Sequence, residues 1–127
     1  MPRILIAEDE KDIRELIAFT LRFAGFDVLL ATNGMEAVEV AEAERPDLVI
    51  LDVRMPKMSG YEACRRLKEN PQTAALPVVF LSAKGQDSEV QQGLESGAEE
   101  YILKPFAPDE LIQQVRDILN RHTQSET

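Results

Sequence analysis

Cysteine, histidine and tryptophan are almost absent from this chain. Its 127 residues include one cysteine, one histidine and no tryptophan. A lone cysteine, Cys64, excludes an intrachain disulfide and fits a reducing compartment. The only histidine, His122, stands near the C-terminus within a polar stretch, which argues against catalysis by histidine. The chain therefore lacks the residues for most thiol and imidazole chemistry.

Long apolar runs and excess basic charge are also missing. No stretch approaches the roughly 20 apolar residues that a membrane span needs. The N-terminal Met1-Pro2-Arg3 leads directly into strand-like sequence, so we expect no signal peptide and a cytoplasmic location. Fourteen basic residues stand against 23 acidic ones, a net charge of −9. We expect no membrane contact and no direct nucleic-acid binding by this domain.

Short apolar runs alternate with helical patterns five times along the chain. The runs predict strands, and the helices between them are indicated by apolar positions at a 3.6-residue period. A fully apolar run, such as Leu48–Leu51, is typical of a central parallel strand. Five strands alternating with five helices predict a single-domain α/β sandwich with right-handed crossovers. The expected strands are Ile4–Ala7, Val28–Ala31, Leu48–Leu51, Val78–Leu81 and Glu100–Leu103.

The helix boundaries follow from caps and helix breakers. The first helix carries an inward stripe from Ile13 to Ala24, with Leu16 among its members, and Gly25 ends it. The second spans Glu36–Glu44 after an Asn33-Gly34 turn. Ser59 caps the third, with Glu62 three residues later. The last two helices are expected at about Asp87–Ser96 and Pro108–Asn120.

Charged residues follow three of the expected strands. Glu8 and Asp9 come after the first, Asp52 after the third and Lys104 after the fifth. The carboxyl ends of parallel strands meet at one sheet edge, where ligands bind. Three carboxylates and one ammonium in one cleft predict a site for a divalent cation and a phosphoryl group.

Six motifs, in a fixed order and spacing, resemble one family closely: the receiver domain of two-component response regulators. The resemblance spans almost the whole chain and implies a flavodoxin-like doubly wound fold with strand order 2-1-3-4-5. The motifs are Ala7-Glu8-Asp9-Glu10, the segment from Pro46 to Pro56, Met58-Ser59-Gly60, Leu81-Ser82-Ala83, Gly97-Ala98 and the segment from Tyr101 to Phe106.

The resemblance marks Asp52 as the phosphoacceptor. It implies that Glu8, Asp9, Asp52 and the backbone carbonyl of Arg54 hold Mg²⁺ or Mn²⁺. Glu8 stands where the family also commonly has Asp; because its side chain is longer, we expect Asp9 to bind the metal directly and Glu8 to bind it through water. The acceptor reaction depends on positioning and charge neutralisation more than on nucleophilic strength.

The same resemblance gives roles to residues on the last two strands. Lys104 is expected to contact Asp52 and then the phosphoryl oxygens, and the Ser82 hydroxyl to donate to those oxygens. Movement of Ser82 would leave space that Tyr101 fills, so these two residues form the expected switch. The residues expected to flank the cleft are Arg54, Ala83, Lys84 and Pro105.

The expected function is a switch that accepts a phosphoryl group from a histidine kinase or a phosphotransfer protein. It would act catalytically only on its own phosphorylation and dephosphorylation, and is not otherwise expected to be an enzyme. Phosphorylation would alter the face formed by the expected elements at 87–96, 100–103 and 108–120, where a partner or a second copy would bind. Residues 1–122 are expected to form the receiver and residues 123–127 a disordered polar tail.

Four alternatives remain to be weighed. The chain could be the N-terminal receiver of a DNA-binding transcriptional regulator. A phosphatase of the haloacid dehalogenase type needs a second Asp two residues after the nucleophile, where this chain has Arg54. A flavodoxin-like cofactor binder lacks support because no G-x-G-x-x-G loop is present. A receiver that has lost phosphorylation disagrees with the complete set Glu8, Asp9, Asp52, Ser82 and Lys104.

Overall fold

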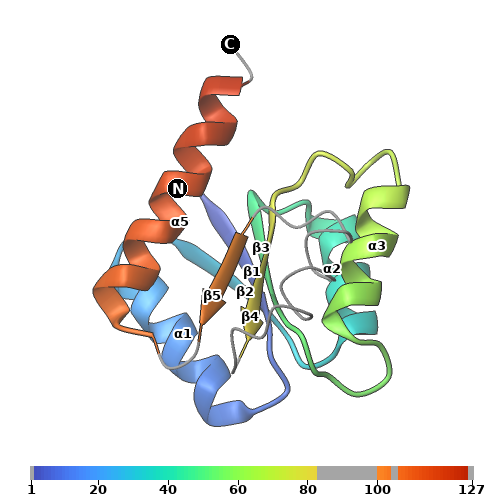
Figure 1. Cartoon of the computed structure of the whole chain (residues 1–127), viewed down its shortest axis with the longest axis horizontal. Helices are drawn as coiled ribbons and strands as arrows, with labels where there is room; N and C mark the ends of the chain where they lie inside the picture. The colour runs from blue at the N-terminus through green and yellow to red at the C-terminus, as the bar shows by residue number, and fades with distance from the viewer. Residues whose placement is uncertain (1, 83–99, 104–105, 126–127) are drawn as a thin grey trace.

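In the computed structural model, one parallel sheet lies between two layers of helices (Figure 1). The structure describes residues 2–82, 100–103 and 106–125, without the side chains of residues 82, 100, 103 and 122–125. The sheet order is β2-β1-β3-β4-β5, and all its neighbours are parallel, as predicted. The strands are β1 (Arg3–Ala7), β2 (Asp27–Ala31), β3 (Leu48–Asp52), β4 (Val78–Ser82) and β5 (Glu100–Leu103).

The helices cover both faces of the sheet. In Figure 1, α1 and α5 lie on one face, and α2 and α3 lie on the other. No helix among the described residues is both long and apolar enough to cross a bilayer. The expected helix at 87–96 lies outside the described residues. The described helices are α1 (Lys11–Phe23), α2 (Gly34–Glu44), α3 (Gly60–Glu69) and α5 (Pro108–Ser125).

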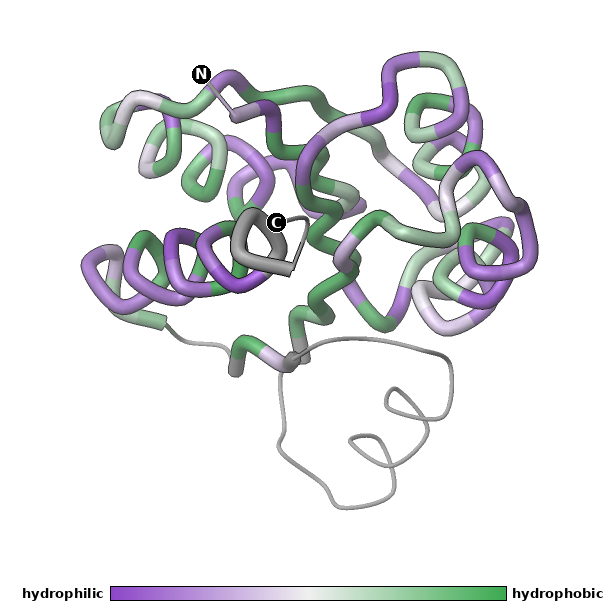
Figure 2. The backbone as a smooth tube through the Cα atoms, turned by 90° about the horizontal axis from the view of Figure 1, so that it is seen from above, coloured by the Kyte–Doolittle hydropathy of each residue, from purple (hydrophilic) through white to green (hydrophobic). Residues whose placement is uncertain are grey.

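The core consists of two apolar clusters, one on each face of the sheet. Side chains alternate across a strand, so Leu5 and Val49 face α2 and α3 whereas Ile4 and Ile50 face α1 and α5. All five residues of β3 are buried, which confirms the prediction of a central strand. Figure 2 shows hydrophobic segments through the middle of the molecule and alternating colours along the helices.

Caps set the helix boundaries, and two expected boundaries are wrong. The Asn33 side chain accepts a hydrogen bond from the Glu36 amide at 2.8 Å, so α2 starts at Gly34 and not at Glu36. Helix α5 continues to Ser125, beyond the expected Asn120, because no proline or glycine interrupts it. The Ser59 cap is confirmed by its hydrogen bond from the Glu62 amide at 3.2 Å. Gly25 has a φ of 99°, as expected for the residue that ends α1.

Helix α1 does not bury the whole stripe predicted from its periodicity. Ile17 and Leu21 are fully buried, but Leu16 is 53% exposed. Leu16 precedes Ile17 by one residue, about 100° around the helix, so it points to the flank when Ile17 faces the sheet. The prediction that Leu16 faces inward is therefore wrong.

Cys64 is fully buried on α3. Burial raises the pKa of its thiol to about 11, so nearly all of it is protonated near neutral pH. It packs in the core as a small apolar side chain, as its sequence context indicates.

Candidate functional site

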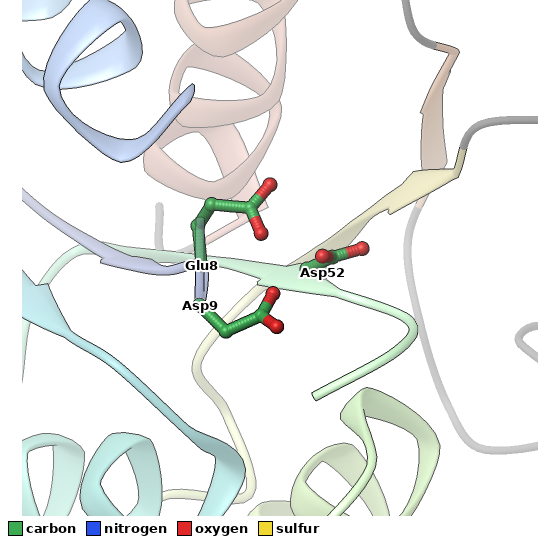
Figure 3. A group of neighbouring side chains, drawn as sticks. All are labelled: Glu8, Asp9 and Asp52. Carbon is green, nitrogen blue, oxygen red and sulfur yellow. The ribbon is translucent and has the colours of Figure 1, made fainter. Parts of the chain in front are cut away.

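Three carboxylates meet at the carboxyl ends of the two central strands. Glu8 and Asp9 directly follow β1, and Asp52 is the last residue of β3. The strands pair with Ala7 level with Leu51, so Glu8 and Asp52 reach the sheet edge together. One oxygen from each carboxylate lies within 4.8 Å of the other two. Figure 3 shows these side chains converging from the two strand ends.

The cluster concentrates negative charge in a poorly solvated place. Glu8 is fully buried and Asp52 is 8% exposed, whereas Asp9 is exposed. Two unit charges about 4 Å apart interact by roughly 4 kcal/mol at the effective dielectric near a protein surface, here as repulsion. Buried carboxylates are stabilised by a positive partner, and three together favour a divalent cation.

The donor set fits Mg²⁺. This ion prefers carboxylate oxygens at about 2.1 Å, so two oxygens on one ion lie no more than about 4.2 Å apart. The spacing of up to 4.8 Å requires only small rotations of the side chains. The carboxylates of Glu8, Asp9 and Asp52 could therefore share one ion, with water completing its octahedral shell.

Hydrogen bonds to backbone atoms fix the loop that carries Glu8 and Asp9. The Glu8 amide donates to the carbonyl of Ala31 on β2 at 3.1 Å. From α1, Nη1 of Arg14 donates to the carbonyl oxygen of Glu8 at 2.8 Å and to that of Asp9 at 3.4 Å. Arg14 thus holds both acidic residues by their backbone. The sequence analysis missed this role, although a basic residue one turn into an acidic helix start was a visible signal.

Gly60 fixes the other side of the site. Its amide donates to the carbonyl of Val53 at 3.0 Å, which ties the start of α3 to the end of β3. A Cβ at Gly60 would lie 2.2 Å from the carbonyl oxygen of Asp52, closer than any real contact. Only glycine allows α3 to approach Asp52 this closely. Gly60 is part of the Met58-Ser59-Gly60 motif, but no sequence pattern showed which atom it approaches.

An open groove of about 740 Å³ lies beside the acidic cluster. Arg54 is exposed and lines this groove; its role beside the cleft stays a prediction. The groove is formed by Asp9, Val53, Arg54, Met55, Pro56, Ser59 and Tyr61.

The expected switch residues lie on adjacent strands. Ser82 ends β4 level with Leu103 of β5, and Tyr101 is half-buried on β5. The Tyr101 hydroxyl lies 3.5 Å from the hydroxyl of Tyr61 on α3, and the ring of Phe80 packs against both tyrosine rings. Sequence reasoning did not predict the contact between the two tyrosines.

Four of the expected site residues lie outside the described residues: Ala83, Lys84, Lys104 and Pro105. Their roles stay predictions, as does the role of the Ser82 side chain. The described part brings together Glu8, Asp9 and Asp52 and places Arg54 beside them.

Comparisons with known proteins agree on one family. The family model described as the response regulator receiver domain matches residues 4–116. The phosphate regulon transcriptional regulatory protein PhoB of Pseudomonas aeruginosa is 45% identical over 118 residues, 93% of this chain and 52% of that protein. The DNA-binding dual master transcriptional regulator RpaA of Synechocystis is 41% identical over 121 residues, 95% of this chain and 50% of that protein. The chain thus spans about half the length of these relatives.

Similarity to a solved structure supports the same family assignment. The receiver domain of a sensor histidine kinase from Pseudomonas aeruginosa PAO1 matches with a TM-score of 0.84 and 31% identity, covering 94% of this chain and 95% of that one. That crystal structure has a magnesium ion coordinated in its active-site cleft.

Proposed function

The chain belongs to the response regulator receiver domain family, and we propose that its Asp52 accepts a phosphoryl group in a reaction that depends on Mg²⁺. The observation that carries this proposal is the convergence of Glu8, Asp9 and Asp52 within 4.8 Å at one sheet edge. The donor would be a histidine kinase or a phosphotransfer protein. The family is one of signalling regulators, so the chain's chemistry would be limited to its own phosphorylation and dephosphorylation.

The transfer needs few groups from the protein. An oxygen of the Asp52 carboxylate attacks the phosphorus of a phosphohistidine, an acyl phosphate forms, and the P–N bond breaks with its electron pair leaving on the imidazole. Asp52 is almost fully buried and its backbone is held against Gly60, which limits the directions of its carboxylate. This positioning supplies most of what such a transfer requires.

A bound Mg²⁺ would offset the negative charge of the carboxylates and of the transferred phosphoryl group. Glu8, Asp9 and Asp52 would hold it by their side chains, and Arg54 would hold it by its backbone carbonyl. Mn²⁺, which also prefers oxygen ligands, would serve in its place. The magnesium ion in the active-site cleft of the related receiver domain supports Mg²⁺ as the metal of this site.

The readout is proposed to pass through β4 and β5. Lys104 would contact the phosphoryl oxygens, the Ser82 hydroxyl would move toward them, and Tyr101 would turn inward. In the described conformation the Tyr101 hydroxyl lies 3.5 Å from that of Tyr61, so movement of Tyr101 would change this contact. The affected face includes β5 and α5, and we propose that a partner or a second phosphorylated copy binds there.

A second candidate concerns the whole protein. Its curated relatives PhoB and RpaA are transcriptional regulators, and this chain matches about half of each. Similarity to these relatives favours the proposal that this chain is the receiver of a DNA-binding regulator, in which residues outside 1–127 would contact the DNA. A cytoplasmic location is part of the same proposal.

Removal of Mg²⁺ should abolish phosphorylation. With acetyl phosphate as the donor, we expect the label per protein to fall at least about tenfold in EDTA and to return when Mg²⁺ or Mn²⁺ is added, because the metal offsets the repulsion between the three neighbouring carboxylates and the dianionic donor. Intact-mass spectrometry measures the labelled fraction. Added Na⁺ at equal ionic strength is the control. Equal labelling in EDTA and in Mg²⁺ would refute the proposal.

A further inference from the structure

Two residues other than glycine have a positive φ in the part of the chain that the structure describes. Arg45 has a φ of 46° and Lys57 a φ of 67°. An L-residue seldom adopts this left-handed region, because its Cβ comes too close to the backbone there, and the conformation costs free energy. Strained residues of this kind gather at functional sites, so each of the two needs its own explanation.

The conformation of Arg45 is explained by the end of helix α2. Arg45 is the C-cap of this helix, and its amide donates to the carbonyl of Ala41 at 2.9 Å. A left-handed residue is a common way to end a helix. Arg45 lies two residues before Asp47, at the sheet edge opposite the acidic cluster. Its strain therefore has no link to the site.

Lys57 ends no helix and lies in the loop that leads from Asp52 to Gly60. The Met58 amide donates to the carbonyl of Pro56 at 2.7 Å, so Lys57 is the central residue of a three-residue turn. With a positive φ at its centre, this is the rarer and more strained form of such a turn. The Lys57 side chain is exposed, so packing of the core does not require it.

Contacts on both sides hold this turn in place. Met58 is 6% exposed, and its carbonyl lies against Gly34, the first residue of α2. A Cβ at Gly34 would lie 2.1 Å from that carbonyl oxygen, so only glycine allows this approach. At the base of the loop, the Gly60 amide donates to the carbonyl of Val53 at 3.0 Å. The surrounding structure thus maintains the strain at Lys57, as expected for a strained residue with a role.

The same loop forms one wall of the groove beside the acidic cluster. Its residues in this wall are Val53, Arg54, Met55, Pro56 and Ser59. At a positive φ, an L-residue is confined to a narrow range of backbone angles, whereas glycine has a wide range. The Cβ of Lys57 therefore restricts the backbone of the loop three residues from Arg54, whose carbonyl is a proposed metal ligand.

We propose that Lys57 is a positioning residue for the metal site, because its strained turn restricts the loop and keeps the backbone carbonyl of Arg54 available to a divalent cation. The role belongs to the backbone of Lys57 and not to its ammonium. The inference rests on the proposed function, since it assigns the turn to the proposed Mg²⁺ site. It predicts that relief of the strain stabilises the fold and weakens metal binding, whereas a purely structural turn would not move the two in opposite directions.

The experiment compares Lys57→Gly with Lys57→Ala, because both remove the ammonium and only Lys57→Ala keeps a Cβ. In EDTA, Lys57→Gly should melt at least about 2 °C above Lys57→Ala, since glycine adopts a positive φ without strain. At a temperature where both variants are folded, the dissociation constant for Mg²⁺ should be at least about threefold higher for Lys57→Gly, because the cation must order a freer loop. The amide NMR signals of Asp9 and Asp52 measure this constant.

Arg45→Gly and Arg45→Ala are the matched control pair. Arg45→Gly should also melt above Arg45→Ala, because it relieves the same kind of strain. The two Arg45 variants should bind Mg²⁺ equally well, since Arg45 lies at the opposite sheet edge. An affinity loss in Arg45→Gly as large as that in Lys57→Gly would overturn the inference.

The outcomes separate this inference from the proposed function. If the wild type binds Mg²⁺ and is phosphorylated, but Lys57→Gly binds Mg²⁺ as tightly as Lys57→Ala, only the role of the turn is overturned. A Lys57→Gly variant that melts no higher than Lys57→Ala would show that the turn stores no strain, and would overturn it as well. A wild type that binds no Mg²⁺ would overturn the proposed function and this inference together.

Discussion

Replacing Asp52 by Asn is expected to abolish phosphorylation by acetyl phosphate in the presence of Mg²⁺. An amide oxygen is not a competent nucleophile, and the substitution also removes a metal ligand, so labelling should fall at least about 100-fold. In Mg²⁺-free buffer the variant should be at least as stable to heat as the wild type, because one of three neighbouring negative charges is gone. Intact-mass spectrometry and thermal melts measure the two effects.

Asp47→Asn is the matched control for this experiment. Asp47 precedes β3 at the opposite edge of the sheet, is exposed, and accepts a hydrogen bond from the Arg3 amide at 2.8 Å, which Asn can also accept. It should be labelled like the wild type. Full labelling of the Asp52→Asn variant, at whatever position, would show that another side chain accepts the phosphoryl group.

Replacing Gly60 by Ala is expected to damage both the fold and the site. The new Cβ would lie 2.2 Å from the carbonyl oxygen of Asp52, and the backbone on at least one side must move. We expect a loss of about 2 kcal/mol in the free energy of unfolding, which lowers the melting temperature by roughly 8 °C. Displacement of Asp52 by even about 1 Å should reduce its rate of phosphorylation roughly tenfold or more.

Arg65→Ala is the control for Gly60, because it introduces alanine at an exposed position of the same helix. It should change stability by less than about 0.5 kcal/mol. Labelling rates are compared at a temperature where every variant is folded, so that loss of fold is not counted as loss of site geometry. A Gly60→Ala variant that melts and reacts like the wild type would contradict the close approach of α3 to Asp52.

The strand pattern of this chain could be predicted because burial of both sheet faces leaves a simple signal. The fully apolar run Leu48–Leu51 predicted the central strand, and β3 is buried throughout. Helix ends were less predictable, since Asn33 suits both a turn and an N-cap, and only its contact with Glu36 decides. The strand order came from resemblance to a family and not from the residues themselves.

The acidic cluster was predictable for the same topological reason. Parallel strands bring their carboxyl ends to one edge, so residues after β1 and β3 had to lie near each other. The side chains that hold this site were harder to predict. Arg14 acts through carbonyl oxygens of Glu8 and Asp9, and Gly60 acts through the absence of a side chain. Neither contact follows from residue type or spacing alone.

Helix α1 shows where periodicity misleads. A 3.6-residue pattern places Leu16 with Ile17 on one apolar face, but a helix on a sheet buries only a narrow part of that face. Leu16 instead joins Phe19 and Phe23 on the outer surface.

A magnesium titration followed by backbone amide NMR tests the central claim most directly. The account predicts that Mg²⁺ shifts the amide signals of Glu8, Asp9 and Asp52 in a saturable manner, and that Mn²⁺ broadens those same signals first. Signals at the opposite sheet edge, such as that of Asp47, should stay unchanged. If Mg²⁺ left all three acidic residues unperturbed, the cluster would not be a metal site and the proposed switch would lose its basis.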